Sequence, residues 1–490
     1  MPQQVVFYVN GHRHSVQEDA VFQPLTDYLR YTICHTGTKV VCQEGDCGAC
    51  TVLVGVPAQE ADTLSYRAVN GCIQYLYQIQ GCHVVTVEGL KSLKGLHPVQ
   101  DAMIACHGAQ CGYCTPGMVM ALSHHFFERT HLQTNVPPTR AEIGNVLTGN
   151  LCRCTGYDSI IKAGCAVNEA EIPSLSELFP EADIARELRA LRATALELIC
   201  EEQCVLIPAA LPEALQYRKD FPSAQVIAGG TDVHVVYNKR FTQPRSVISL
   251  ALVSELSQIK KEGNQLTIGA MARLSDLETW FQSQWPEGAK LLNLFGSPQI
   301  KQVGTLAGNI ANGSPIGDTL PFLFVLNAML ELTSVEGDRQ IPINQFYTGY
   351  KQTLMKPHEL ITAIRFTLPA PQEYVKLYKV SKRSHLDISA FTAAFRFTLS
   401  ECGIIQSMAI AYGGVGPTVA RLSNTEAFLM DKSFTRSVMQ EAGQLAMSEI
   451  SPLDDVRGSR NYRLQLARNI LCKLYEEFQN TAANQEAIVS

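Results

Sequence analysis

The chain opens with two short runs in which apolar and polar residues alternate, and Asn10 and Gly11 separate the runs. Alternation is typical of half-buried β-strands, and an Asn-Gly pair suits a tight hairpin because both turn residues need a positive φ. A further strand-like run lies at residues 84–90. We therefore predict a small β-rich domain over residues 1–90.

Helical periodicity replaces this alternation after residue 90. Thr115 and Pro116 are predicted to be the N-cap and the first residue of one helix, since a hydroxyl residue followed by proline is typical of helix starts. Thr139 and Glu142 have the spacing of a capping box, which predicts the start of a second helix. Residues 91–165 should form a compact helical domain.

Mixed patterns follow over the rest of the chain. Residues 166–203 are rich in Ala, Leu and Glu, and we predict an interdomain linker that contains a helix. Residues 204–370 alternate strand-like pieces with Gly-rich turns, and a proline-containing run at 368–374 indicates a further boundary. Residues 371–490 combine strands with helices. Together these patterns predict an α+β multidomain protein.

Length and charge restrict the function classes. A chain of 490 residues exceeds the roughly 250 to 300 residues at which a single core stops growing. The net charge of −6 provides no overall positive field, so we expect no nucleic acid and no membrane as a partner. The longest apolar stretch, Leu320–Leu332, is interrupted by Pro321 and Asn327 and is shorter than the ~18 residues of a membrane span.

Cysteine is the unusual component of this sequence, because twelve of the 16 cysteines lie within residues 1–165. The first residues show no charged segment followed by an apolar one, so secretion is not expected. A chain of this size also differs from the small secreted domains that depend on disulfides. We predict a cytoplasmic protein whose cysteines are reduced and free to bind metal.

The first cysteine set consists of Cys42, Cys47 and Cys50, with four and then two intervening residues, and a more distant Cys72. This is the spacing of plant-type [2Fe–2S] proteins. Glycines inside the run allow a loop to wrap closely and to direct backbone N–H groups at sulfur. Structural zinc is the alternative, but it favours simpler pairs of cysteines.

The second set consists of Cys111 and Cys114 at the start of one predicted helix, and Cys152 and Cys154 after the end of another. Two such pairs can converge in a helical domain and hold a second iron–sulfur centre. Zinc is again the weaker alternative, because a pair separated by one residue is tight for a zinc site. Cys106 repeats the spacing of the first set but lacks its glycines, and we predict that it is not a ligand.

Two later runs have the character of ligand-binding loops. Residues 225–232 indicate a strand that leads into a Gly-Gly turn, a shape that can direct backbone N–H groups at phosphate, although an ordinary β-turn has the same pattern. Residues 304–318 concentrate small residues, hydroxyls and amides in an extended loop, where Asn309 and Asp318 could hydrogen-bond a sugar-like chain.

The cysteine-containing runs CQEGDCGAC, VNGCIQ, QCGYCTPGMVM and GNLCRCTGYDSI resemble the iron–sulfur half of the molybdenum hydroxylase family, which includes xanthine dehydrogenase and aldehyde oxidase. The resemblance implies a β-grasp ferredoxin-like [2Fe-2S] domain (1–90) and a helical-bundle [2Fe-2S] domain (91–165). It also implies that the cluster nearer the flavin is held by Cys42, Cys47, Cys50 and Cys72, and the cluster nearer molybdenum by Cys111, Cys114, Cys152 and Cys154.

The two later runs resemble the FAD-binding region of the same family, which implies an α+β FAD-binding domain (204–370) and a C-terminal α+β flavoprotein domain (371–490). Lys382 lies in a loop that borders the flavin in relatives and influences access for NAD, and the choice between Lys379 and Lys382 stays open. The other residues that the resemblance assigns to FAD are Ile227, Ala228, Gly229, Gly230, Thr231, Asp232, Phe295, Thr305, Gly308, Asn309, Ser314 and Asp318.

The point at which the sequence stops leads to a prediction of its function. Single-chain members of the family continue with a large molybdopterin-binding region, whereas this sequence stops at Ser490 and offers no catalytic base. The resemblance implies the electron-transfer subunit of a split xanthine dehydrogenase, with a large molybdopterin-binding partner subunit in a dimer of heterodimers. Electrons from hypoxanthine or xanthine, oxidised to urate, would pass through two [2Fe-2S] clusters to FAD and then to NAD.

Three alternatives remain at this point. The first is the equivalent subunit of another molybdenum hydroxylase, acting on an aldehyde or an N-heterocycle and reducing oxygen or a carrier. The second is a stand-alone iron–sulfur flavoprotein reductase without a molybdenum partner. The third is an interaction protein held together by zinc, with no redox activity.

Overall fold

The computed structural model describes residues 4–58, 61–92, 95–134, 136–199, 203–242 and 246–489, with side chains through residue 480. The chain forms two compact units. Unit 1 comprises residues 1–255, 273–275 and 297–305, and unit 2 comprises residues 256–272, 276–296 and 306–490. The boundary between the two units after residue 255 therefore falls inside the predicted FAD-binding domain. Each unit is described by itself.

Unit 1 begins with a five-stranded sheet in the order β2-β1-β5-β3-β4. The predicted hairpin is confirmed: β1 and β2 pair antiparallel across Asn10 (φ 48°) and Gly11 (φ 83°). β1 and β5 pair parallel, and the remaining neighbours pair antiparallel. The strands are β1 (Val5–Val9), β2 (His12–Val16), β3 (Thr51–Pro57), β4 (Leu64–Asn70) and β5 (His83–Val85).

Four helices follow the sheet, two of them at the predicted helix starts: α2 (Pro98–Ala105), α3 (Thr115–His131), α4 (Arg140–Val146) and α5 (Asp158–Cys165). The capping box of Thr139 and Glu142 is confirmed at the start of α4. The predicted N-cap Thr115 is wrong by one residue. Cys114 already has helical φ and ψ and is the N-cap of α3, so the Thr115 hydroxyl does not cap the helix.

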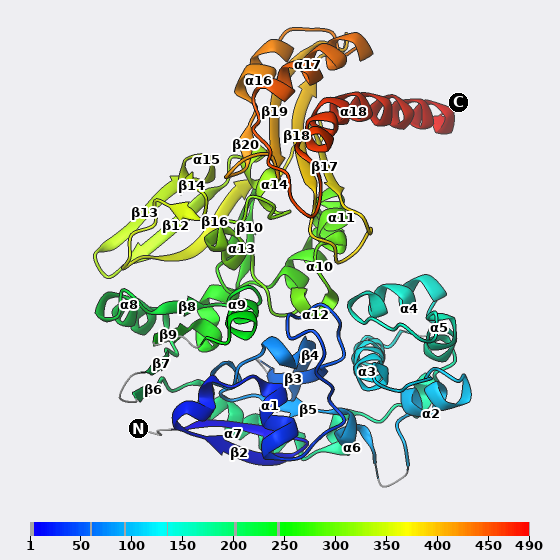
Figure 1. Ribbon diagram of the computed structural model, residues 1–490, viewed down its shortest axis with the longest axis vertical. Helices are drawn as coiled ribbons and strands as arrows, with labels where there is room; N and C mark the ends of the chain where they lie inside the picture. Colours follow the sequence, from blue (N-terminus) through cyan, green and yellow to red (C-terminus); the bar gives the residue numbers. More distant parts are fainter. Residues whose placement is uncertain are drawn as a thin grey trace. The chain divides into compact units, whose positions relative to one another are not determined.

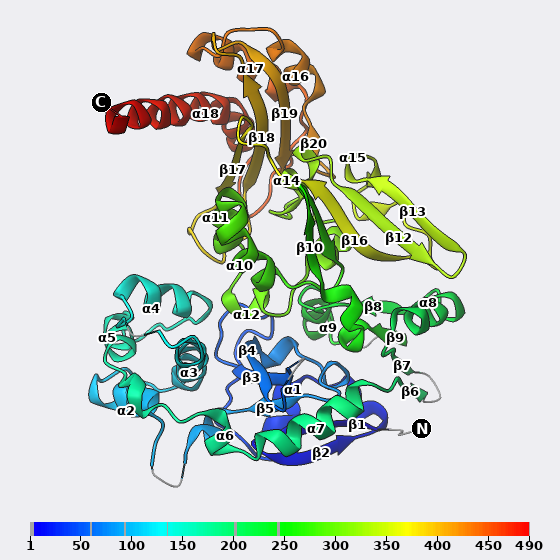
Figure 2. The same ribbon diagram turned by 180° about the vertical axis from the view of Figure 1, so that it is seen from behind.

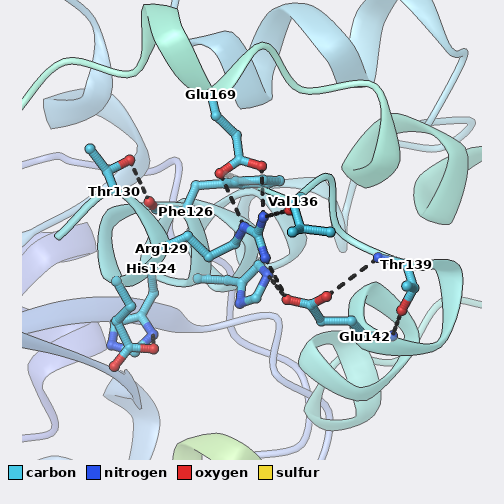
Figure 3. Close-up of polar contacts among 10 residues, drawn as sticks. His124, Phe126, Arg129, Thr130, Val136, Thr139, Glu142 and Glu169 are labelled. Atoms are coloured by element: carbon cyan, nitrogen blue, oxygen red, sulfur yellow. Dashed lines mark hydrogen bonds and ion pairs between the residues drawn. The ribbon is translucent and has the colours of Figure 1, made fainter. Parts of the chain in front are cut away.

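A buried arginine joins this helical region (Figure 3). Arg129 on α3 has a side chain that is 8% exposed, and it bonds Glu142 of α4 at 2.8 Å. Its guanidinium also forms two 3.0 Å hydrogen bonds to the Glu169 carboxylate, which follows α5 in the chain. A buried arginine is stable only when it is paired in this way, so the network fixes α3 against α4 and the segment after α5.

The predicted linker is largely structured, because it contains α6 (Leu175–Leu178), α7 (Glu181–Arg192) and β6 (Leu196–Ile199), while residues 200–202 lie outside the described residues. α7 contacts β1 and β3, and Figure 2 shows it lying across this sheet. Its apolar face, Ile184, Ala185 and Leu188, is buried in the same core as Leu53 and Val85. An interdomain linker would remain exposed, whereas this segment belongs to the core.

The last sheet of unit 1 has the order β6-β7-β9-β8, with β7, β8 and β9 parallel to one another. Its apolar residues share one core with the N-terminal sheet, which explains why the compact unit extends to residue 255. The remaining elements of unit 1 are β7 (Cys204–Ile207), α8 (Leu211–Asp220), β8 (Gln225–Ile227), α9 (Val233–Arg240), β9 (Ser246–Ser249) and α12 (Pro298–Lys301).

Unit 2 contains two main antiparallel sheets. The first has the order β10-β11-β16-β12-β13, and its strands are β10 (Ile259–Glu262), β11 (Gln265–Gly269), β12 (Met329–Ser334), β13 (Gly337–Pro342) and β16 (Leu360–Thr367). The accompanying elements are α10 (Leu274–Gln284), α11 (Pro286–Leu294), α13 (Leu306–Asn312), α14 (Leu320–Val325), α15 (Ile343–Phe346), β14 (Tyr347–Gly349) and β15 (Gln352–Thr353).

The second sheet of unit 2 has the order β17-β18-β19-β20 and is covered by the last three helices (Figure 1). Its elements are β17 (Tyr374–Val380), β18 (Phe391–Leu399), β19 (Ile405–Gly413), β20 (Ala420–Arg421), α16 (Ser423–Leu429), α17 (Arg436–Ser448) and α18 (Arg460–Val489). In the described part of the chain, no helix is both long enough and apolar enough to cross a membrane.

Candidate functional site: two cysteine sets and two loops

The four thiols of the first set lie against one another. The Cys42 thiol is hydrogen-bonded to those of Cys47 and Cys72, and the Cys72 thiol is also hydrogen-bonded to that of Cys50. The loop before β3 supplies three of these residues, and the turn after β4 supplies Cys72. The predicted grouping of the four residues is thus present in the fold, and the contacts form one chain from Cys47 through Cys42 and Cys72 to Cys50.

Contact between thiols makes their ionisation interdependent. Hydrogen bonds from Cys47 and Cys72 lower the pKa of Cys42, and the same bonds to Cys42 raise the pKa of Cys47 and of Cys72. One thiolate is therefore favoured while its neighbours keep their protons, because adjacent negative charges repel. Four thiolates could coexist here only around a strong positive charge, which the two ferric ions of a [2Fe-2S] cluster supply.

The loop of the first set also has the predicted backbone. Gly48 has a φ of 66°, and a Cβ at this position would lie 2.2 Å from the carbonyl oxygen of Gly149, so no larger residue fits without movement. The Glu44 N–H points at the Cys42 sulfur over 3.5 Å. Backbone N–H groups that face sulfur are suited to stabilise the negative charge of a bound cluster.

The second set is also paired. The sulfurs of Cys111 and Cys154 lie 3.5 Å apart, and the Cys114 thiol is hydrogen-bonded to that of Cys152. Burial, followed by the Cys152 contact, raises the pKa of Cys114 to about 12. Cys106 caps the end of α2 and packs on the helical core, and no sulfur contact joins it to this set within the described residues.

Pairs of cysteines are what a binuclear cluster requires, since two thiolates bind each iron of a Cys₄ [2Fe-2S] centre. The second set consists of two such pairs, and the chain of contacts in the first set contains two as well, Cys42 with Cys47 and Cys50 with Cys72. Among the described residues, no group of three or more His, Cys, Asp or Glu side chains has the arrangement of a single-ion site.

The two sets are direct neighbours in unit 1. The Leu151 N–H donates to the Cys47 carbonyl oxygen at 2.9 Å, and the Asn150 side-chain amide donates to the Gly48 carbonyl oxygen at 3.0 Å. Gln299 in turn donates to the Asn150 side-chain oxygen at 2.8 Å. Asn150 lies just before Cys152, so one short backbone segment connects the two predicted cluster sites. The role of Asn150 could not be predicted from the sequence, because its partners Gly48 and Gln299 are distant along the chain.

The first predicted flavin run ends β8 and leads directly into α9. Ile227 is buried, Ala228 and Thr231 are half-buried, and Asp232 is the exposed N-cap of α9. At Gly229 a Cβ would lie 2.2 Å from the Val303 carbonyl oxygen, and Gly230 has a φ of 74°. The predicted strand and Gly-Gly turn are thus present, and the helix N-terminus that follows them adds N–H groups that are suited to phosphate.

The second run differs from the predicted extended loop, because α13 occupies residues 306–312. Thr305 is the buried last residue of its unit 1 segment, while Gly308 and Asn309 lie in α13, in unit 2. Asn309 accepts a hydrogen bond from the Thr319 hydroxyl at 2.6 Å. Ser314 is half-buried in the following loop, and Phe295 is half-buried at the C-terminal end of α11.

Asp318 is the centre of a buried polar group in unit 2. Lys379, whose side chain is 2% exposed, forms a 2.7 Å ion pair with it and also donates to the Leu294 carbonyl oxygen at 3.0 Å. The Ser389 hydroxyl donates to the other carboxylate oxygen at 2.5 Å. Lys382, the predicted cofactor residue, is instead exposed and donates to the Val456 carbonyl oxygen at 3.3 Å. The geometry thus joins Lys379, and not Lys382, to Asp318.

Comparison with known proteins assigns these regions. Residues 86–165 match the [2Fe-2S] binding domain, residues 200–371 the FAD binding domain in molybdopterin dehydrogenase, and residues 376–478 the CO dehydrogenase flavoprotein C-terminal domain. Xanthine dehydrogenase 1 of Arabidopsis thaliana is 29% identical over 541 residues, which cover 96% of this chain. The chain is homologous to the iron–sulfur and FAD region of the molybdenum hydroxylases. The predicted resemblance is confirmed.

Other molybdenum hydroxylases match equally well. Aldehyde oxidase 1 of Bos taurus is 30% identical, over 97% of this chain. The chain spans about two fifths of the length of these curated relatives, 39% in both cases.

Solved structures match slightly more than half of the chain. A chain of carbon monoxide dehydrogenase from Hydrogenophaga pseudoflava, 28% identical, has a TM-score of 0.53 over 56% of this chain and 96% of its own. A chain of quinoline 2-oxidoreductase from Pseudomonas putida 86, 26% identical, has a TM-score of 0.51 over 55% of this chain and 94% of its own. The α+β multidomain class with iron–sulfur, FAD-binding and flavoprotein domains is confirmed, while the β-grasp description stays a prediction.

Proposed function

We propose that this chain carries electrons between a molybdenum site on a partner polypeptide and a soluble acceptor. The observation that supports this most is the arrangement of the two cysteine sets, each paired, with Leu151 N–H bonded to the Cys47 carbonyl oxygen. Two clusters held by these residues would be close neighbours. Bound iron–sulfur centres supply one-electron transfer, and bound FAD converts single electrons into a hydride pair.

The residues proposed to hold FAD fall into two groups. The Gly229-Gly230 turn and the N-terminus of α9 suit the pyrophosphate, because they present backbone N–H groups at the positive end of a helix. Asp318, with Lys379 and Ser389, forms a buried polar group that suits the hydrogen-bonding parts of the flavin. Of the two candidate lysines, Lys379 and Lys382, we propose that Lys379 belongs to the flavin site.

The proposed reaction is the oxidation of hypoxanthine and xanthine to urate, with NAD as acceptor. The named xanthine dehydrogenases support it, and the partner would be a large molybdopterin-binding subunit in a dimer of heterodimers. An aldehyde-oxidising enzyme is the second candidate, favoured by the 30% identity to aldehyde oxidase 1. Separate matched chains in two other molybdenum hydroxylases support a split arrangement.

Purification of the chain from native cells tests the proposal. We expect two kinds of [2Fe-2S] signal, flavin absorbance and a copurifying molybdenum-containing chain, and NADH formation from hypoxanthine. Zinc in place of iron, or a chain without flavin, would contradict the electron-transfer function. Oxidation of aldehydes but not of purines would instead favour the second candidate.

Two lysine variants test the flavin site. Lys379→Met should lose most of its FAD during gel filtration, because it removes the partner of buried Asp318. Lys382→Met changes an exposed residue of the same type and should retain FAD. Equal FAD content in the two variants, with both folded, would argue against the assignment of Lys379.

A further inference from the structure

Helix α9 connects the first flavin run to the first cysteine set. It begins directly after the Gly229-Gly230 turn, and its side chains contact the backbone on both sides of the cysteine ligands. The His234 Nδ1 lies 2.9 Å from the carbonyl oxygen of Ile73, the residue after Cys72. The Asn238 side-chain amide donates to the Cys72 and Gln43 carbonyl oxygens, each at 2.9 Å.

A charged pair completes this contact. The Lys239 ammonium donates to the Cys42 carbonyl oxygen at 2.9 Å and pairs with Glu44 at 3.0 Å. The two side chains are 49% and 41% exposed, so their charges are partly screened by water. The loop that carries three of the four proposed ligands therefore has the negative charge of Glu44 on it and the positive charge of Lys239 beside it.

The first turn of α9 is firmly anchored. His234 is fully buried, stacks on Tyr75 with ring centroids 4.3 Å apart, and its Nε2 lies 2.5 Å from the Tyr77 hydroxyl. Tyr75 also donates to the Asn238 side-chain oxygen at 3.0 Å, which fixes the amide so that its NH₂ faces the ligand loop. Because His234 and Asn238 are held this closely, the backbone of α9 stays beside the ligand loop.

We propose that α9 positions and tunes the N-terminal cluster: Asn238 holds the ligand loop, and the Lys239–Glu44 pair sets the cluster's reduction potential. This inference rests on the proposed function, because it requires a cluster at Cys42, Cys47, Cys50 and Cys72. One-electron reduction of a [2Fe-2S] centre adds one negative charge. Lys239 favours the reduced state and Glu44 favours the oxidised state, since opposite charges attract and like charges repel.

Redox titration with dithionite, followed by electron paramagnetic resonance of the full cofactor-loaded chain, tests the tuning. Lys239→Gln should lower the midpoint potential of one [2Fe-2S] signal, and Glu44→Gln should raise the potential of that same signal. The second signal should remain unchanged in both variants and serves as an internal reference. Added salt should shrink both shifts, because the pair is half-exposed.

Arg240→Gln is the matched control, since it removes the same charge from the neighbouring residue of α9. Arg240 is exposed, and no hydrogen bond or ion pair among the described residues joins it to the ligand loop. Its potentials should equal those of the unmodified chain. Equal shifts in Arg240→Gln and Lys239→Gln, shifts of the same sign in Lys239→Gln and Glu44→Gln, or a shift of the other cluster would overturn the proposal.

The positioning role has its own measurement. Asn238→Ala removes two hydrogen bonds to the ligand loop, and iron should leave the N-terminal cluster for a chelator about tenfold faster. The second cluster should lose iron at its normal rate. Equal rates for both clusters in the variant and the parent would overturn the role of Asn238. A chain that never contains two [2Fe-2S] signals would contradict the proposed function itself, and so the two failures are distinguishable.

Discussion

The two cysteine sets of unit 1 have the same chemistry but different surroundings. In the first set Cys47, Cys50 and Cys72 are buried and only Cys42 is partly exposed, whereas in the second set Cys111 and Cys154 are exposed. The first lies between a sheet and α9, and the second lies in the segments that come directly before α3 and α5. A buried site favours stable retention of a cofactor, while an exposed site allows close approach of another molecule. The two sets thus suit an internal carrier and a carrier that receives electrons from outside.

The largest expected effect comes from removing one ligand of each set. Cys72→Ser should abolish the N-terminal cluster signal and also lower the stability of unit 1, because its buried loop loses the cluster that holds it. Cys154→Ser should abolish only the other signal and leave the thermal unfolding of the N-terminal sheet almost unchanged. Iron content and resonance spectra measure the loss of each cluster.

In Cys154→Ser, transfer from substrate should stop while NADH still reduces a dye at the flavin. Loss of the dye reaction in a folded Cys154→Ser protein would contradict this order of carriers.

The next largest effect tests whether the Arg129 network stabilises the helical region that holds the second cysteine set. Arg129→Ala leaves Glu142 and Glu169 without their buried partner, and breaking such a network typically costs about 3 to 5 kcal/mol. The free energy of unfolding of the helical region, measured in urea, should fall by this amount. Arg129→Lys should recover part of the loss. A change below about 1 kcal/mol in Arg129→Ala would show that the second set does not depend on this support.

An intermediate effect concerns pH and the N-terminal sheet. His83 is fully buried, and burial lowers its pKa to about 3 from an ordinary value of 6.5. Below pH 6.5 this histidine is protonated in the unfolded chain but stays neutral in the folded chain. The free energy of unfolding therefore falls as the pH drops from 6.5 towards 3. At pH 5 the loss amounts to roughly 2 kcal/mol relative to neutral pH.

Urea unfolding at pH 7 and pH 5 measures this loss. Between pH 7 and pH 5, the free energy of unfolding of His83→Gln should fall by roughly 2 kcal/mol less than that of the unmodified chain, because the variant lacks the histidine that is protonated on unfolding. His12→Gln, which changes an exposed histidine of the same sheet, should behave like the unmodified chain. Identical pH dependence in the two variants would contradict a neutral His83.

The smallest effect comes from a surface ion pair between α7 and β2. Arg13 and Glu187 lie 2.7 Å apart, but their side chains are 47% and 36% exposed. Pairs of this kind contribute less than about 1 kcal/mol. Arg13→Ala should therefore shift the urea midpoint only slightly, and less in high salt. A loss as large as that of Arg129→Ala would mean that α7 depends on this pair and not on its apolar face.

Local signals predicted the parts of this molecule that depend on neighbouring residues. The Asn10-Gly11 hairpin and the Thr139–Glu142 capping box follow from turn and helix-end chemistry and were correct. The grouping of the cysteines followed from their spacing. The resemblance to the family gave the order of the domains.

Long-range contacts could not be predicted in this way. The richness of residues 166–203 in Ala, Leu and Glu predicted a linker, yet three apolar positions of α7 are enough to bury this helix. The link between Asn150 and Gly48 joins residues far apart in sequence, as does the pair of Lys379 and Asp318. Lys379 and Lys382 lie in the same basic run of the sequence. Only the structure shows that Lys379 lies in β17 with a buried side chain, whereas Lys382 follows this strand and is exposed.

The packing of α7 determines where the iron–sulfur part of this chain can be separated from the rest. A fragment that ends at Cys165 contains all eight proposed ligands but omits Ile184, Ala185 and Leu188, which complete the core around Leu53 and Val85. Such a fragment would expose that apolar surface and tend to aggregate. A fragment that continues to Arg192 would cover this surface, and one that continues to residue 255 would also keep the core that the N-terminal sheet shares with β6, β7, β8 and β9. The unit of function and the unit of independent folding therefore have different ends.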